Sequence, residues 1–188
     1  MILRKIRSAF LKIYKFSRCK IVIFGFRYFQ EGITIGSNVY IEKGVRLNST
    51  DGGVINIASN AYIGGHSSLI ARGGKIEIGK NVFIAHGCIL VSQSMIEIGD
   101  DTLLGDYVVI RDQDHSYSSR PIRDAGFKST SVSIGVDCWI GAKASILRGS
   151  VVSDGAVVGA HALVRGYVPP YSLVGGVPAK VLKLLQRP

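Results

Sequence analysis

The chain has 188 residues and a formal net charge of +10 at pH 7; 47% of its residues are hydrophobic and 19% are charged. This length suits a single domain, and the apolar fraction excludes an intrinsically disordered chain. The longest apolar stretch, residues 21–26, is far shorter than the ~20 residues that cross a membrane as a helix. The three cysteines, Cys19, Cys88 and Cys138, form neither an even set nor a CxxC pair, which predicts a reducing, cytoplasmic environment.

The positive charge is concentrated at the N-terminus. Residues 1–20 contain no acid and these cations: Arg4, Lys5, Arg7, Lys12, Lys15, Arg18 and Lys20. Apolar residues at helical spacing accompany them, among them Ile6, Phe10 and Ile13, which predicts a basic amphipathic helix over residues 1–20. Such a helix suits peripheral contact with the inner face of a membrane, and packing of its apolar face on the domain is the alternative. Because the cations lie outside the body of the chain, no nucleic-acid partner is expected.

A six-residue unit repeats from residue 33 onward. The aliphatic residues that open the hexads are Ile35, Ile41, Leu47, Ile57, Ile63, Leu69, Ile78, Ile84, Leu90, Ile98, Leu104, Ile110, Ile134, Ile140, Ile146, Val152, Val158 and Val164. In the first two hexads of each group of three, the second residue is usually Gly or Ala and the fifth is small or β-branched. An inward aliphatic residue followed by a small corner residue predicts one short strand per hexad, so that three hexads close one triangular coil.

This periodicity predicts an all-β fold, a parallel β-helix of about six stacked coils over residues 21–178, followed by a short C-terminal helix over residues 179–188. The groups begin at residues 35, 57, 78, 98, 134 and 152. The first three intervals exceed eighteen residues by a few, which predicts small bulges at the corners. The fourth interval spans 36 residues, and residues 111–133 do not continue the aliphatic register, so they are predicted to leave the prism as a long loop.

The loop begins with a histidine beside two carboxylates, in the run Arg111-Asp-Gln-Asp-His115. A histidine can take a proton from a hydroxyl near neutral pH, and a carboxylate can fix its tautomer. His115 is therefore a candidate general base, with either Asp112 or Asp114 as its orienting partner. A solvated loop histidine is the alternative when these residues are considered alone.

The hexads of residues 98–109 and 134–145 resemble those of the hexapeptide-repeat acyltransferases. The resemblance implies a left-handed coil, acetyl-CoA as co-substrate, and a homotrimer with its sites between subunits. Polysaccharide and sugar O-acetyltransferases of this group carry their catalytic base on such a loop, which implies that role for His115.

The resemblance also implies a donor site formed by Trp139, Gly141, Ala142 and Ala160. Backbone N–H groups there would receive the pantetheine amides and the thioester oxygen, with the Ala142 N–H stabilising the developing oxyanion. Trp139 would pack on the pantetheine arm, on a neighbouring subunit, or on both.

The segment of residues 168–180 resembles the end of the family's repeat domain. In the predicted C-terminal helix, Lys180, Lys183 and Arg187 would share one face suited to the cofactor's phosphates.

Further polar residues are candidates to bind the acceptor or a metal ion. His86, Asp106 and Tyr107 fall on successive coils and are candidates to line an acceptor cleft, and Arg120 in the loop would suit an acidic acceptor. The histidines include no close pair, so no metal site is predicted. Cys88 and Cys138 occupy the fifth hexad position and are predicted to be packing residues.

Together these features predict an acetyl-CoA-dependent O-acetyltransferase, with a sugar hydroxyl of a bacterial surface polysaccharide (capsule, O-antigen or exopolysaccharide) or its lipid-linked precursor as acceptor. One alternative is an N-acetyltransferase of an amino sugar or antibiotic. A non-catalytic β-helical scaffold protein is the other.

Overall fold

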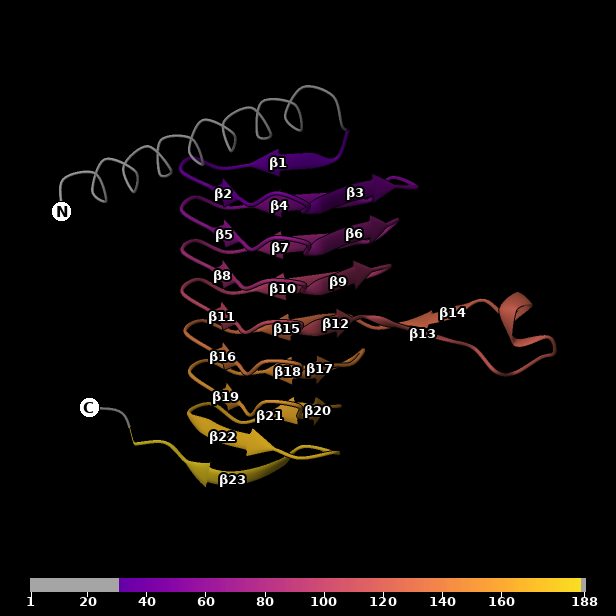
Figure 1. The fold of residues 1–188 in the computed structure, drawn as a ribbon. Helices are drawn as coiled ribbons and strands as arrows, with labels where there is room; N and C mark the ends of the chain where they lie inside the picture. The colour runs from indigo at the N-terminus through magenta and orange to yellow at the C-terminus, as the bar shows by residue number, and fades with distance from the viewer. Residues whose placement is uncertain (1–30, 187–188) are drawn as a thin grey trace.

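The computed structural model describes residues 31–186, which form a prism of stacked β-coils with one arm (Figure 1). Sheet A holds β1 (Ile33–Ile35), β4 (Val54–Ile57), β7 (Lys75–Ile78), β10 (Met95–Ile98), β15 (Val132–Ile134), β18 (Val151–Val152) and β21 (Tyr167–Val168). Sheet B holds β2 (Tyr40–Ile41), β5 (Tyr62–Ile63), β8 (Phe83–Ile84), β11 (Leu103–Leu104), β16 (Trp139–Ile140), β19 (Val157–Val158), β22 (Ser172–Gly175) and β23 (Lys180–Leu184). Sheet C holds β3 (Arg46–Thr50), β6 (Ser68–Arg72), β9 (Ile89–Ser92), β12 (Val109–Arg111), β17 (Ser145–Ile146) and β20 (Leu163–Val164).

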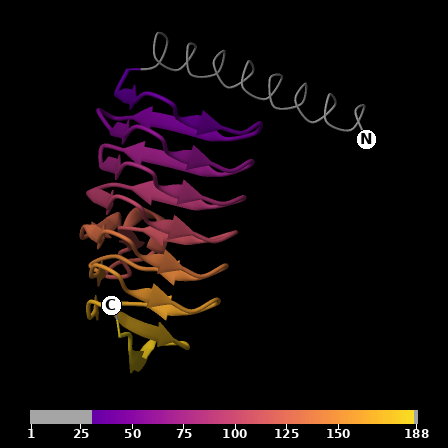
Figure 2. The same cartoon turned by 90° about the vertical axis from the view of Figure 1, so that its left-hand side faces the viewer.

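The coils stack in register, as Figure 2 shows from the side. Each complete coil contributes one strand to each sheet, and each strand pairs in parallel with its counterpart in the next coil, as in Ile84↔Leu104 and Leu104↔Ile140. The parallel β-helix of six coils predicted from the hexads is confirmed, while its left-handed sense stays a prediction. The extra residues of the first three coils lengthen β3, β6 and β9, so the predicted corner bulges are replaced by longer strands.

The core is the column of inward aliphatic residues. All eighteen residues predicted to point inward are buried, with exposed fractions of 6% or less. The fifth-position residues are buried as well, apart from the half-buried Val45. The small second residue lets neighbouring corners approach: a Cβ on Gly105 would lie 2.7 Å from the nitrogen of Ala142, closer than two such atoms can approach without displacement.

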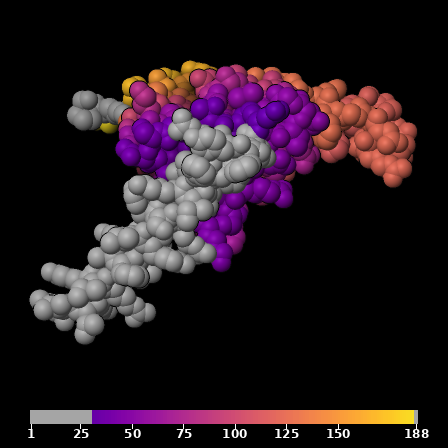
Figure 3. Space-filling view, turned by 90° about the horizontal axis from the view of Figure 1, so that it is seen from above, coloured from indigo at the N-terminus to yellow at the C-terminus, as the bar shows by residue number. Residues whose placement is uncertain are grey.

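The excursion is a β-hairpin, so the prediction of a structureless loop is wrong. β13 (Gln113–His115) and β14 (Phe127–Ser129) pair antiparallel, and the 3-10 helix η1 (Ile122–Asp124) lies between them. Beneath the hairpin β10 pairs directly with β15, with Ile98 opposite Ile134. The prism therefore continues as if the insertion were absent, and the arm projects from its side (Figure 3).

The C-terminal segment corrects a second prediction. Lys180–Leu184 forms strand β23, antiparallel to β22, in place of the helix predicted over residues 179–188. The open edge of β22 offers unpaired N–H and C=O groups, and pairing with this edge outweighs the helical spacing of the lysines. The helix predicted for residues 1–20 lies outside the described residues. Within residues 31–186 no helix has the length and apolar character needed to cross a bilayer.

Two adjacent leucines of β11 test the inward register. Leu104 is fully buried and Leu103 is 47% exposed, so Leu104→Ala should lower the free energy of unfolding by about 2–5 kcal/mol. Leu103→Ala, the matched control, should change it by no more than about 0.5 kcal/mol. Chemical denaturation of both variants measures the difference, and equal losses would contradict the register.

Candidate functional site

His115 ends the first strand of the hairpin and is exposed. It lies opposite Phe127 in the ladder, and the two ring centroids are 4.2 Å apart with a tilt of 39°. Contact with the phenyl ring limits the rotation of the imidazole while leaving its nitrogens accessible. His115 is therefore placed on an arm, close to solvent, as a general base that must meet a second substrate would be.

Both candidate partners of His115 bond to other groups in this chain. The fully buried Asp112 accepts hydrogen bonds from the Ser92 hydroxyl (2.7 Å) and from the backbone N–H groups of Gln93 (2.8 Å) and Ser94 (2.8 Å). These donors occupy both of its oxygens. A buried carboxylate whose oxygens are all hydrogen-bonded is a structural anchor, and here it joins the start of the hairpin to the preceding coil.

Asp114 also has another partner. Its Oδ2 lies 2.6 Å from Nε of Arg148, in the turn that follows β17. A second guanidinium nitrogen, Nη1, lies 3.4 Å from the hydroxyl of Thr130. Sequence reasoning missed Arg148, because 34 residues separate it from Asp114 and no local motif joins the two.

Three of the predicted donor residues, Gly141, Ala142 and Ala160, lie along one edge of the prism, the corner between sheets B and C. The N–H of His86 is capped by Oδ1 of Asp106 at 3.1 Å. Among residues 31–186, by contrast, no acceptor is bonded to the N–H of Ala142 or of Ala160. In three successive coils the N–H groups of Asp106, Ala142 and Ala160 thus have no bonded acceptor within the described residues, and such donors suit the carbonyl oxygens of a bound thioester cofactor.

The acceptor candidates of the B–C corner stand directly above these amides. His86 Nδ1 lies 3.3 Å from Asp106 Oδ1, and its Nε2 lies 3.0 Å from Oε2 of Glu42, which sequence reasoning missed. Tyr107 occupies a left-handed backbone conformation and its ring covers Gly87, where a Cβ would be 2.5 Å away. His86 and Asp106 therefore form a polar cluster continuous with the amide edge, and Tyr107 has at least a packing role.

The outward face of sheet B carries an apolar column beside this edge. Its members are Tyr40, Tyr62, Phe83, Leu103, Trp139, Val157 and Leu173, one from each coil. The rings of Tyr62 and Phe83 stack at 4.7 Å. Trp139 is 56% exposed and stands next to the unpaired amides, so its indole face is available to a flexible apolar ligand arm.

Two lysines lie in β23, the last strand of sheet B. In β23, Lys183 lies opposite Leu173 and Lys180 lies opposite Gly175, with a bulge at Leu182. Since Leu173 and Gly175 share the outward face and directly opposed residues point the same way, the bulge places both lysines on that face. Their cationic grouping below Trp139 is thus kept, although the helix predicted to carry them is a strand.

The structure separates His115 from this edge. The hairpin leaves the prism between β12 of sheet C and β15 of sheet A, whereas Ala142 lies between β16 of sheet B and β17 of sheet C. Figure 1 shows the hairpin projecting on the right and the strands of sheet B at the left. Arg120 lies on the same arm, also away from the edge. One chain alone does not bring the base and the donor edge together.

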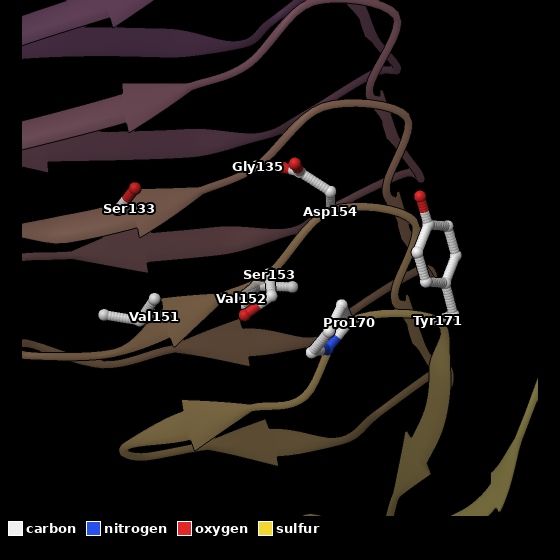
Figure 4. Close-up of a pocket in the computed structure, with 8 residues that line it drawn as sticks. All are labelled: Ser133, Gly135, Val151, Val152, Ser153, Asp154, Pro170 and Tyr171. Carbon is white, nitrogen blue, oxygen red and sulfur yellow. The ribbon is translucent and has the colours of Figure 1, made fainter.

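A shallow open groove of about 420 Å³ lies at the third corner, between sheets A and B (Figure 4). Val151, Ser153, Pro170 and Tyr171 line it, with the carboxylate of Asp154 at one side. That carboxylate accepts the N–H of Val136 at 2.8 Å. No predicted site residue lines the groove. In the described part of the chain, no three His, Cys, Asp or Glu side chains are grouped to hold a metal ion.

Comparison with known proteins identifies the repeat. A family model described as "Hexapeptide repeat of succinyl-transferase" matches residues 131–161. A protein of Mycobacterium tuberculosis named a probable acetyltransferase is 38% identical over 148 residues, 77% of this chain and 49% of that protein. The chain belongs to the hexapeptide-repeat acetyltransferase family. It spans about half the length of the mycobacterial member.

Two further members are similar over most of the chain. A protein of Escherichia coli K12, named for O-acetyl transfer in lipopolysaccharide biosynthesis, is 29% identical over 191 residues, 96% of this chain and 87% of that protein. A mutant of AntD, an N-acyltransferase from Bacillus cereus in complex with dTDP and coenzyme A, is 25% identical with a TM-score of 0.72. That match covers 81% of this chain and 84% of AntD.

The two described cysteines should be unreactive in the native protein. Burial raises the pKa of Cys88 from 9.0 to about 11 and also raises that of Cys138, so both thiols stay protonated at pH 8 and thiolate attack is suppressed. Iodoacetamide at pH 8 should therefore leave the peptides containing Cys88 and Cys138 unmodified until denaturant is added, as measured by mass spectrometry.

The same shift has a consequence for stability. Because its folded pKa exceeds the unfolded value, Cys88 contributes stability below pH 9 that is lost as the pH rises toward 11. Rapid alkylation of either residue in the native protein at pH 8 would contradict the assigned packing role.

Proposed function

We propose that this chain is an acetyl-CoA-dependent O-acetyltransferase whose acceptor is a sugar hydroxyl of a bacterial surface polysaccharide or its precursor. The observation that carries the proposal is the B–C edge, where two unpaired amides lie below a His–carboxylate cluster and beside an exposed indole. The E. coli relative, named for lipopolysaccharide O-acetyl transfer, supports the choice of acceptor.

The donor would lie along the outward face of sheet B. Lys180 and Lys183 suit its phosphates as cationic donors, and Trp139 suits its pantetheine arm. The amides of Ala142 and Ala160 would receive its carbonyl oxygens. The co-substrate supplies an acetyl group activated as a thioester. An N–H fixed in the backbone stabilises negative charge that develops on the thioester oxygen without having to reorganise.

His115 would act as the general base. Its imidazole takes the proton of the sugar hydroxyl while that oxygen bonds to the acetyl carbon, and the carbon–sulfur bond breaks. The proton then passes to the departing thiolate, so the products are an acetyl ester and free CoA. The base is neutral at the start and is restored at the end, as this chemistry requires.

The site would be shared between copies of the chain. His115 and the donor edge lie at different corners of one prism, so a second copy must bring its hairpin to the edge of the first. In a homotrimer each subunit can make this contact with the next, because rotational symmetry closes the three contacts into a ring. The exposed indole of Trp139 is large and apolar enough to contribute to subunit contacts. The free buried cysteines suit a reducing cytoplasm.

Transfer to an amine is the second candidate function. The similarity to AntD, an N-acyltransferase bound to dTDP and coenzyme A, favours it. An amine acceptor would use the same donor edge, so the two candidates differ in the acceptor alone. The acetyltransferase names of the relatives argue against a non-catalytic scaffold.

Replacement of His115 tests the function. General-base catalysis contributes about 10²–10⁴-fold, so His115→Ala should lower kcat by that factor and leave the affinity for acetyl-CoA unchanged. Release of free CoA measures kcat, and calorimetry measures donor binding. His66→Ala is the matched control, because this exposed histidine covers Gly44 at another coil and has no assigned role.

The acceptor panel for this assay should contain hydroxylated glycans, amino sugars and aminoglycosides. Turnover with glycans alone supports the first candidate, and turnover with amines alone supports the second. Wild-type kcat in His115→Ala would contradict the role of the histidine, and failure to bind acetyl-CoA would contradict both candidates.

A further inference from the structure

We infer that Arg148 is a positioning residue of the proposed reaction: acting through Asp114, it fixes the hairpin that presents His115. The inference rests on the proposed function, because it concerns the placement of the proposed base. It reassigns Asp114, which the sequence suggested as a direct partner of the imidazole, to the support of the arm.

The hairpin cannot hold its own position. Its ladder contains only three residue pairs, from Gln113↔Ser129 to His115↔Phe127, and an isolated two-stranded ribbon is marginally stable in water. Residues 117–124 of the arm are exposed, with Tyr117 82% accessible. The orientation of the hairpin must therefore be set at its root, where the chain leaves the prism.

The first support is a set of hydrogen bonds that joins the root of the hairpin to the preceding coil. Buried Asp112 accepts the three hydrogen bonds from the turn that begins at Ser92. Its own carbonyl accepts the N–H of Thr130 at 2.8 Å, which ties the start of the hairpin to its end. These hydrogen bonds fix where the arm begins, but they act on only one side of the root of the hairpin.

The second support joins the root of the hairpin to the following coil. Arg148 follows β17, and its guanidinium contacts Asp114 of the first hairpin strand and Thr130 beyond the second. The neighbouring Gly149 donates its N–H to the carbonyl of Thr130 at 3.0 Å. A planar guanidinium with several fixed donors can bridge two such groups, which a lysine ammonium does less well.

The two faces of the hairpin show why the contact with Arg148 leaves the imidazole of His115 free. Asp114 lies opposite Lys128 and His115 lies opposite Phe127, and successive residues of a strand point to opposite faces. Arg148 therefore holds the face opposite the imidazole. Since adjacent Cα atoms are ~3.8 Å apart, fixing Asp114 fixes the backbone of His115 without contact with its ring.

Loss of the support should reduce turnover without affecting the donor. A misplacement of ~1 Å can cost up to 10²-fold in rate, and the Asp112 support remains, so we expect Arg148→Ala to lower kcat about tenfold. KM for acetyl-CoA should change less than about twofold, because the donor edge lies at another corner. Hydrogen exchange over residues 112–130 should become faster.

A double-mutant cycle tests whether Arg148 acts through Asp114. If it does, Asp114→Asn and the double variant should each lose about tenfold, whereas independent roles would give about a hundredfold in the double variant. Arg165→Ala is the matched control, an exposed arginine of the next coil. Arg148→Lys should recover part of the lost kcat, and it replaces Arg148→Ala if the alanine variant does not fold.

Wild-type kcat in Arg148→Ala, or an additive cycle, would overturn the inference. Full turnover in His115→Ala together with loss in Arg148→Ala would instead contradict the proposed base, which separates the two failures.

Discussion

The structure depends on one packing constraint: every sixth residue must place an aliphatic side chain inside a triangular coil. Because the coils pair as parallel strands, Ile84, Leu104 and Ile140 lie directly above one another, and every outward residue is aligned in the same way. Columns on the surface follow from the column in the core. The amides of Ala142 and Ala160 therefore follow one edge of the prism, and the indole of Trp139 and the lysines of β23 lie on the adjoining outward face of sheet B.

The same constraint explains where variation is tolerated. The hairpin is inserted between β12 and β15 without disturbing the pairing of β10 with β15, so the arm is free of the hexad rule and can carry reactive and charged side chains. Its placement then depends on supports outside the repeat, the buried carboxylate of Asp112 and the Arg148–Asp114 pair. The core thus builds the edge that we propose for the donor, while side-chain contacts place the arm that carries the proposed base.

This division also accounts for what the sequence could predict. The inward residues, the sheet-forming hexads and the extent of the excursion follow from periodicity, because each hexad repeats the same local rule. The roles of Asp112 and Arg148 do not. Asp112 lies one coil from its donors, 18 to 20 residues away, but the hexad rule does not predict that its carboxylate is buried. Arg148 lies 34 residues from Asp114, which lies on an arm that does not follow the repeat. The prediction of a C-terminal helix was wrong because the spacing of residues within Lys180–Leu184 does not indicate that the edge of β22 is open to pair with this segment.

The central claim is that the base of one copy serves the donor edge of another, and a subunit-mixing experiment tests it most directly. His115→Ala lacks the base, and Ala160→Trp fills the exposed donor corner; each should be inactive alone. Random co-assembly at equal amounts should restore about a quarter of wild-type activity, because an intact base then meets an intact edge at one site in four of a cyclic oligomer. Mixed oligomers of confirmed composition without activity would show that both parts serve the same chain and would contradict the account.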